Sequence, residues 1–240
     1  LTMIVLVTTV VSCDSWLDLG SEDRIMENTL FSSQAGFMTA LNGVYIELNT
    51  NELYGRNLTA GALDVMGQYY SVASSSHAFY NYGGLVYTGN DEKALFDNMW
   101  QKCYAVIACC NTIIEKCDEN KAGLSPVWKG SIKGEALALR AMLHFDMLRL
   151  FSASPAIDKE RKAIPYLESY TNLPQHQLTV GAVLEKVVKD LNAARELMRE
   201  VDPYGPNYAK LESLYRNHPL LRNRQKHLNY YAVTALLARV

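Results

Sequence analysis

The sequence predicts an all-α fold: a tetratricopeptide-like helical repeat scaffold interrupted by long irregular loops. Three segments carry apolar residues at alternating spacings of four and three, which is the pattern of helices that bury one face. Two of these segments follow each other across a short loop, and recurring paired helices are typical of helical repeat arrays. The stretches between them are rich in Gly, Ser, Asn or Pro, which indicates irregular chain.

The stretch 90–151 organises the prediction, because it reads as two long helices joined by the loop 118–126. Gly123 and Pro126 in that loop supply a helix stop and a helix start, and Asn90 is expected to cap the first helix. The first helix should face one neighbour along a single apolar seam, with Trp100 in the core, and the second should present a similar stripe. The seam comprises Phe96, Trp100, Cys103, Ile107, Cys110, Ile114 and Cys117, and the stripe comprises Ile132, Ala136, Leu139, Leu143, Met147 and Leu150.

Polar side chains on these two helices are interpreted as structural. Asn111 lies beside the seam and should hydrogen-bond an adjoining loop. Glu135 and Arg140 are five residues apart and do not share a face, so we expect them to pair with the neighbouring helix rather than to act in catalysis. His144 and Asp146 point in different directions, which excludes a metal pair between them.

The remaining elements follow in order along the chain. Residues 18–30 are polar and read as irregular, and the next helix begins at Ser32 or Ser33 as its cap. A short helix is expected within 53–65, and three prolines keep 152–177 extended. Thr179 caps a third long helix, striped from Val180 to Val201, and an irregular insert at 202–218 precedes a final helix at 224–240. The helix after Ser33 is predicted to bury Ala35, Met38, Leu41, Tyr45 and Leu48.

Composition places the chain among ordinary globular proteins, with 49% apolar and 20% charged residues. The net charge of −2 gives no basic footprint for nucleic acid. Of the five cysteines, Cys103, Cys110 and Cys117 are seven residues apart on one helix, too far apart along its axis to form disulfides with one another. We interpret them, with Cys109, as small core residues. No cysteine or histidine cluster has metal-ligand spacing, and no cofactor is expected.

The first residues read as a secretion signal. Residues 1–11 are apolar but too short to span a membrane, and they end in Val-Val-Ser directly before Cys13. We predict that 1–12 is a lipoprotein signal peptide whose N-terminal start is missing, and that Cys13 is acylated after cleavage. The alternative is a buried N-terminal strand.

The segment 67–89 loses helical periodicity and gathers aromatic residues among Gly, Ser and Asn. Long loops inside compact domains are usually functional or disordered. Tyrosine rings can stack on the apolar face of a sugar while polar neighbours meet its hydroxyls. The predicted glycan-binding residues are Tyr69, Tyr70, His77, Tyr80 and Tyr82; the alternative is that these rings only pin the loop to the helices.

Two motifs resemble those of the SusD/RagB family of outer-membrane glycan-binding lipoproteins. A W-x-x-x-Y-x-x-I-x-x-x-N run begins at Trp100 and ends at Asn111, and a G-E-A-x-x-x-R-A-x-x-x-F-x-x-L run begins at Gly134 and ends at Leu148. Ser152 departs from the pattern, which often has Gly there. The resemblance implies that 13–240 is the N-terminal helical domain of a SusD-like protein, truncated at its C-terminus. It also implies a lipid-anchored protein on the cell surface of the outer membrane that binds oligosaccharides or polysaccharides and delivers them to a SusC-like TonB-dependent transporter.

Two other functional classes remain open on the sequence. Helical arrays commonly bind peptides or proteins on a concave face, so the chain could be an interaction scaffold of the cell envelope without glycan binding. An enzyme is disfavoured, because we find no nucleophile–base pair, no metal spacing and no phosphate-binding loop.

Overall fold

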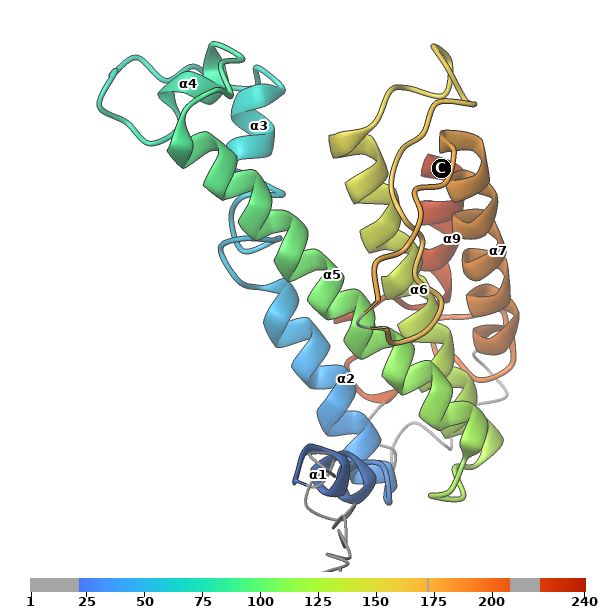
Figure 1. Cartoon of the computed structure of the whole chain (residues 1–240). Coiled ribbons are helices and arrows are strands. Elements are labelled where there is room, and N and C mark those ends of the chain that lie inside the picture. Colours follow the sequence, from blue (N-terminus) through green and yellow to red (C-terminus); the bar gives the residue numbers. More distant parts are fainter. Residues whose placement is uncertain (1–21, 172, 208–220) are drawn as a thin grey trace, which may run out of the picture.

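The computed structural model describes residues 22–171, 173–207 and 221–240, and within these ranges every regular element is helical (Figure 1). The only β pairing there is an isolated antiparallel bridge between Lys162 and Thr179. The all-α prediction is therefore confirmed. The elements are α1 (Glu22–Leu30), α2 (Gln34–Leu48), α3 (Ala62–Met66), α4 (Tyr80–Gly83), α5 (Asn90–Glu119), α6 (Pro126–Phe151), α7 (Val180–Arg199), the 3-10 helix η3 (Arg224–Lys226) and α9 (Tyr230–Arg239).

Helix α6 lies at the centre of the molecule. It packs against α5 and α2 on one side and against α7 on the other, and α9 packs on α7. Figure 1 shows α5 and α6 meeting at their connecting loop and diverging toward the other end, where α3 and α4 sit on the first turns of α5. The divergence leaves two arms, and the candidate site described below lies between them.

Helix α5 is buried on two sides rather than along one seam. Five seam residues are buried as predicted, while Phe96 and Trp100 are half-buried at the edge of the core. A second row is also buried, because α2 covers the side of α5 that the single-seam prediction left free. That row comprises Met99, Val106 and Ile113.

Helix α6 is buried on nearly every side, so more of its residues are buried than the single predicted stripe includes. Two glycines allow the backbone of α7 to come close. A methyl group on Gly130 would lie 2.9 Å from the carbonyl oxygen of Leu197, and one on Gly134 would lie 2.9 Å from Met198 Cγ. Small residues at these positions therefore set the spacing between α6 and α7.

The helix caps follow local chemistry, with one exception. Ser33 accepts a hydrogen bond from the backbone of Gly36 at 3.2 Å, and Thr179 does the same for Ala182 at 3.2 Å, both as predicted. The cap of α5 is Gly89, and Asn90 is its first helical residue, so the prediction for Asn90 was wrong.

Three further predictions need correction. Residues 22–30, read as irregular, form α1, which packs on α2. The buried stripe of α2 is shifted from the predicted one: Phe37, Leu41, Val44 and Leu48 are buried and Ala35 is exposed. The last helix begins at Tyr230 and not at 224, because Asn229 caps it through Ala232 N at 2.9 Å.

The cysteine predictions are confirmed for three of the four described residues. Cys103, Cys110 and Cys117 are free and buried, whereas Cys109 is free and exposed. Cys13 and the signal-peptide prediction lie outside the described residues. Within the described part of the chain, no helix is long and apolar enough to cross a membrane.

Candidate functional site

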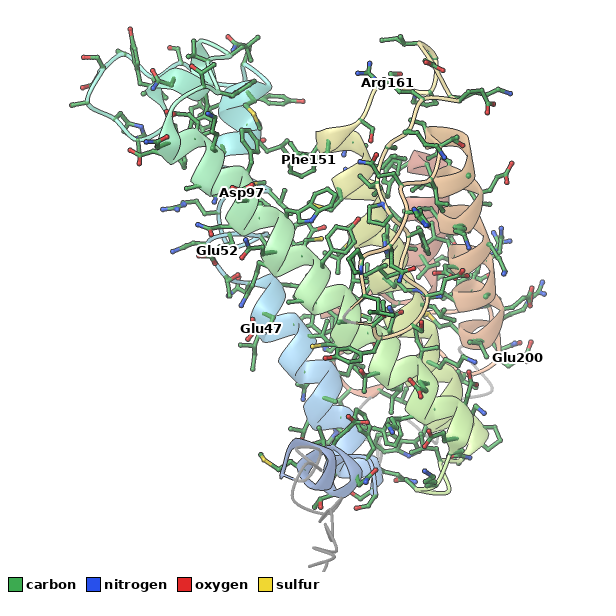
Figure 2. The ribbon with its side chains drawn as sticks, viewed as in Figure 1. Glu47, Glu52, Asp97, Phe151, Arg161 and Glu200 are labelled. Carbon is green, nitrogen blue, oxygen red and sulfur yellow. The ribbon has the colours of Figure 1, made fainter. Side chains whose placement is uncertain are left out.

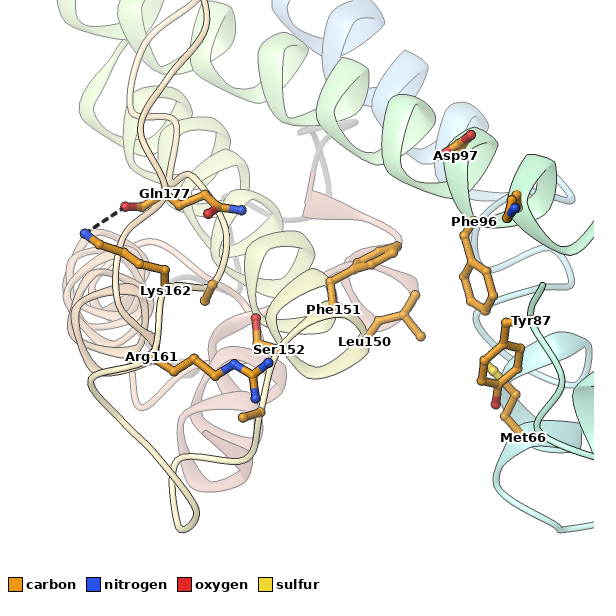
Figure 3. A pocket seen from close by; sticks show the side chains of 13 residues that line it. Met66, Tyr87, Phe96, Asp97, Leu150, Phe151, Ser152, Arg161, Lys162 and Gln177 are labelled. Carbon is orange, nitrogen blue, oxygen red and sulfur yellow. Dashed lines mark hydrogen bonds between the residues drawn. The ribbon is translucent and has the colours of Figure 1, made fainter. Parts of the chain in front are cut away.

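A broad groove of about 880 Å³ crosses the C-terminal end of α6 where the two arms diverge (Figure 3). At one end it is lined by α3, by the segment before α5 and by the first turns of α5. In the middle it passes over the last residues of α6, and at the other end it reaches the connector 152–179. Its volume falls in the range of about 300–1,000 Å³ that is usual for ligand sites.

Aromatic rings line the first part of the groove. The Tyr87 and Phe96 rings meet edge to face with centroids 5.5 Å apart, and Phe96 meets Phe151 in the same manner at 6.1 Å. Phe151 is 37% exposed although it lies beside the core, and Figure 2 shows it projecting from the end of α6 toward α5. Such rings offer flat apolar faces to a ligand with apolar C–H groups.

Polar and charged side chains line the second part. Arg161, Lys162 and Gln177 come from the connector, and all three are exposed. Lys162 Nζ donates to the backbone carbonyl of Gln177 at 3.3 Å. Lys93 and Asp97 lie at the opposite end, four residues apart on α5. Figure 3 shows Arg161 and Asp97 at opposite ends of the groove.

The connector is fastened to the helices by side chains that bond its main chain. Tyr104 donates to the carbonyl of residue 165 at 2.8 Å, and Asn111 donates to the carbonyls of residues 167 and 169 at 3.1 and 3.2 Å. Arg140 donates to the carbonyl of residue 168 at 3.1 Å, and His144 Nε2 accepts from the N–H of residue 167 at 3.0 Å. The prediction that Asn111 would bond an adjoining loop is thus confirmed.

The predicted tyrosine loop lies beside the groove's α3 and α5 end, and its side chains differ in exposure. Tyr69 is 82% exposed and Tyr80 is 43% exposed, whereas Tyr82 is only 2% exposed. Tyr70 donates its hydroxyl to the carbonyl of Ala60, so it pins the loop to the turn before α3. His77 is exposed, and its Nδ1 accepts from the backbone N–H of residue 79 at 3.1 Å.

Tyr82 anchors the loop instead of facing solvent. Its ring packs against Phe79, Tyr87 and Phe96 at centroid distances of 5.8, 6.2 and 5.9 Å. Together with Ala62 and Val65 it forms a small core separate from the main one. Burial raises the pKa of Tyr82 to about 12, and neighbouring Glu92 adds to this. In this conformation the ring supports the loop and is not presented to a ligand.

Sequence reasoning missed the cationic part of the groove. Arg161 and Lys162 lie in a proline-containing connector with no periodic pattern, and Phe151 ends the predicted helical stretch 90–151 with no local signal that assigns it to a groove. The signal available was the adjacent pair of basic residues at 161 and 162 directly before an apolar pair, but only the fold brings that pair to the end of α6.

Two buried ionic networks lie apart from the groove's lining residues and are structural. In the first, Arg140 Nε and Nη2 donate to the two carboxylate oxygens of Asp190 on α7 at 2.7 and 2.8 Å. Tyr166 donates to the same carboxylate at 2.6 Å, and its ring stacks on His144 at 3.8 Å. The predicted structural role of Arg140 is confirmed. Burial works to lower the pKa of Arg140, but the bonds to Asp190 outweigh it and raise the pKa.

In the second network the carboxylate of Glu135, on the central helix, meets three partners. Arg224 and Tyr45 donate to it, and His227 Nδ1 lies 2.7 Å from it. Arg224 also donates to Asp202 at 2.7 Å. Burial works to raise the pKa of Glu135, but Arg224 and His227 outweigh it and the pKa is lowered. Glu135 therefore pairs with Tyr45 of the neighbouring helix α2, as predicted, and in addition with η3 and the residue that follows it.

Neither network resembles a catalytic or metal centre. Each buried charge is balanced by an opposite charge or by hydrogen bonds. The partners come from segments that are distant in sequence, so each network holds those segments together. No group of three or more potential ligands for a metal ion is present within the described residues.

Residues 15–207 match the model of a family described as starch-binding and associating with the outer membrane, SusD-like. A curated relative, SusD-like protein P2 of Formosa agariphila, is 24% identical over 201 residues, which make up 82% of this chain and 37% of that protein. A putative sugar binding protein of Bacteroides vulgatus has a similar fold, with a TM-score of 0.63 at 22% identity, over 86% of this chain and 42% of that one. A SusD-like carbohydrate binding protein of the same organism gives a TM-score of 0.60 at 22% identity, over 86% and 45%. The chain thus spans less than half the length of these relatives.

Proposed function

This chain belongs to the SusD-like family of outer-membrane-associated starch- and glycan-binding proteins, and we propose that it binds oligosaccharides at the cell surface without chemical turnover. The observation that carries the proposal is the open groove next to the loop 67–89, with exposed rings beside exposed hydrogen-bonding groups. A sugar ring has C–H groups that stack on an aromatic face and hydroxyls that need polar partners.

Within the loop, the rings proposed to contact the glycan are those of Tyr69 and Tyr80. Both are exposed, and neither is held by a hydrogen bond from its hydroxyl within the described part of the chain. Tyr70 and His77 flank them, and Tyr82 supports the loop from its core. This division of roles refines the predicted set of five residues without adding to it.

Delivery to a transporter is the second part of the proposal. A SusC-like TonB-dependent transporter would receive the glycan, with the protein tethered to the outer membrane through acylated Cys13. A stable tether of this kind needs more than one acyl chain. Mass spectrometry of the protein from its native host should find Cys13 as the acylated N-terminus, and copurification should retain a SusC-like partner. An unmodified residue 13 would overturn the tether, and purification without any transporter would overturn the partner.

The glycan-binding proposal is tested by removing the two exposed rings. Tyr69→Ala and Tyr80→Ala should each weaken binding of a cognate oligosaccharide about fivefold, since a stacked ring contributes about 1 kcal/mol. Isothermal titration against a panel of oligosaccharides provides the measurement. Tyr231→Ala is the matched control, because Tyr231 is 58% exposed on α9 and lies outside both the loop and the groove.

Equal affinities for the wild type and both loop variants would remove the loop from the site. Retention of a peptide or protein partner by the intact chain, with no oligosaccharide bound at any concentration, would favour the interaction-scaffold alternative. Hydrolysis of an oligosaccharide by the purified protein would contradict binding without turnover.

A further inference from the structure

We propose that the groove across the end of α6 selects sugars that carry a carboxylate or a sulfate group, with Arg161 and Lys162 as the anion-binding residues. The inference rests on the proposed glycan-binding function and adds the chemical class of the ligand. It depends on the charge at the connector end of the groove and on the apolar surface next to it.

The guanidinium of Arg161 is available to a ligand. Within the described residues it makes no hydrogen bond or ion pair, and Figure 3 shows it directed toward the end of α6. Lys162 uses one N–H on the carbonyl of Gln177, at the long distance of 3.3 Å, and an ammonium group has three donors. A guanidinium fork can bind both oxygens of a carboxylate or two oxygens of a sulfate.

The main chain holds both cations in place. Arg161 accepts at its carbonyl from Val180 N at 3.0 Å and donates its N–H to Asp158 Oδ1 at 3.1 Å. Lys162 forms the antiparallel bridge with Thr179, which is the N-cap of α7. Because the backbone is fixed at both positions, less conformational entropy is lost when a ligand binds there.

None of the residues that line the connector end of the groove is acidic. The charged residues that line the groove are three cations, Lys93, Arg161 and Lys162, and one anion, Asp97. The groove is therefore positive, although the whole chain has a net charge of −2. Asp97 lies at the α5 end, where Lys93 shares its helical face. Asp158 turns its carboxylate to backbone N–H groups of residues 160 and 161. The excess of positive charge among the lining residues is therefore at the connector end.

The apolar middle of the groove favours a saccharide over a bare anion. Phe151 stands between the cations and the Tyr87–Phe96 pair, and Leu150 lines the groove beside it. A sugar chain could place one ring on Phe151 while its carboxylate or sulfate reaches Arg161. The side-chain amide of Gln177 and the hydroxyl of Tyr87 remain for sugar hydroxyls.

The test measures the affinities of three probes of similar length: trigalacturonate, a sulfated galacto-oligosaccharide and neutral galactotriose. The expected result is that at least one anionic probe binds about tenfold or more tightly than the neutral one at low salt, and that the preference shrinks as salt rises. Arg161→Gln combined with Lys162→Gln should weaken the anionic probe about tenfold or more and leave the neutral probe unchanged. Arg161→Lys should recover part of the loss, because it keeps the charge without the fork.

The matched control is Lys121→Gln, which removes one charge from the α5–α6 loop, at the end of the helix pair remote from the groove. It should leave all three affinities unchanged. Comparison of trigalacturonate with the sulfated probe tells which anionic group is preferred. Because both target side chains are exposed, the variants should unfold at the temperature of the wild type.

Equal binding of neutral and anionic probes, with no effect of the double variant, would overturn this inference and leave the proposed glycan-binding function intact. Absence of binding by all oligosaccharides would overturn both. Tighter binding of a glutamate-rich peptide or of anionic phospholipid vesicles than of the saccharides, with the same dependence on Arg161, would overturn the assignment to a sugar.

Discussion

Removal of the carboxylate from Asp190 is expected to destabilise the fold strongly. Arg140 and Asp190 are each 4% exposed, and the carboxylate receives two hydrogen bonds from Arg140 and one from Tyr166. In Asp190→Ala the guanidinium would remain buried with only Asn111 Oδ1 and the carbonyl of residue 168 as acceptors. Leaving one partner of a buried ion pair without its counter-charge costs about 3–5 kcal/mol.

Urea denaturation followed by circular dichroism measures this cost. With an m-value of about 3 kcal/mol/M, the midpoint should fall by about 1–1.7 M. Asp118→Ala is the matched control: the Asp118 side chain is 53% exposed and pairs with Lys129 and Lys133, so the loss should stay within about 1 kcal/mol. A cost for Asp190→Ala no larger than that of the control would refute the reasoning.

A second variant separates the lost bonds from the unpaired charge. Combining Arg140→Met with Asp190→Leu removes both charges while filling the space with apolar atoms. Because replacement of a buried ion pair by apolar residues is often neutral or stabilising, this double variant should be more stable than Asp190→Ala. Equal instability of the two would show that the unpaired guanidinium is not the main cost.

Three further predictions concern pH, close packing and capping. Burial lowers the pKa of His144 from 6.5 to about 3, so between these values the unfolded chain binds a proton that the folded chain does not. Stability should therefore fall as pH decreases through this window, by up to about 1.4 kcal/mol per pH unit, and His144→Gln should flatten a plot of unfolding free energy against pH; an unchanged slope would contradict this. Gly130→Ala should lower the free energy of unfolding by about 1–3 kcal/mol in urea titrations, because its methyl group would clash with the carbonyl of Leu197. A gain in stability from the higher helix propensity of Ala would argue against a close contact between α6 and α7 at this position. Thr179→Ala should cost about 1 kcal/mol through the lost bond to Ala182, measured in the same titration, and no loss would show that water replaces the cap.

The sequence predicts the long helices well because their signals are local. Alternating spacings place Cys103, Ile107 and Cys110 on one face whatever else the chain does, and Ser33 and Thr179 cap helices through their own neighbours. The role of Asn111 was predictable for a related reason: a polar side chain beside a buried seam needs partners, and a loop supplies carbonyls. These inferences require no knowledge of which helices become neighbours.

The groove could not be predicted because no local pattern joins its parts. Met66, Phe96, Phe151 and Arg161 come together only through the angle between α5 and α6, which side-chain packing along the whole length of both helices determines. The burial of Tyr82 could not be predicted from its local sequence either. Its neighbours in sequence are polar and glycine-rich, yet a small core forms around its ring.

Arg224 is a further case in which tertiary contacts override the local reading. It lies in a stretch rich in basic residues, where side chains are usually exposed to water. The fold instead buries it completely between Glu135 of α6 and Asp202, which follows α7. Long-range charge pairing of this kind has no signature in periodicity.

The fastening of the connector to α5 and α6 also bears on how ligand preference could change during evolution. The main chain that carries Arg161 is held further along by Asn111, Arg140 and His144, all of them buried. A substitution at one of these inner positions would shift the outer wall of the groove without altering any atom that lines it. Selection for a new ligand can therefore act on the interior of the protein, and a comparison of surface residues alone would overlook the responsible change.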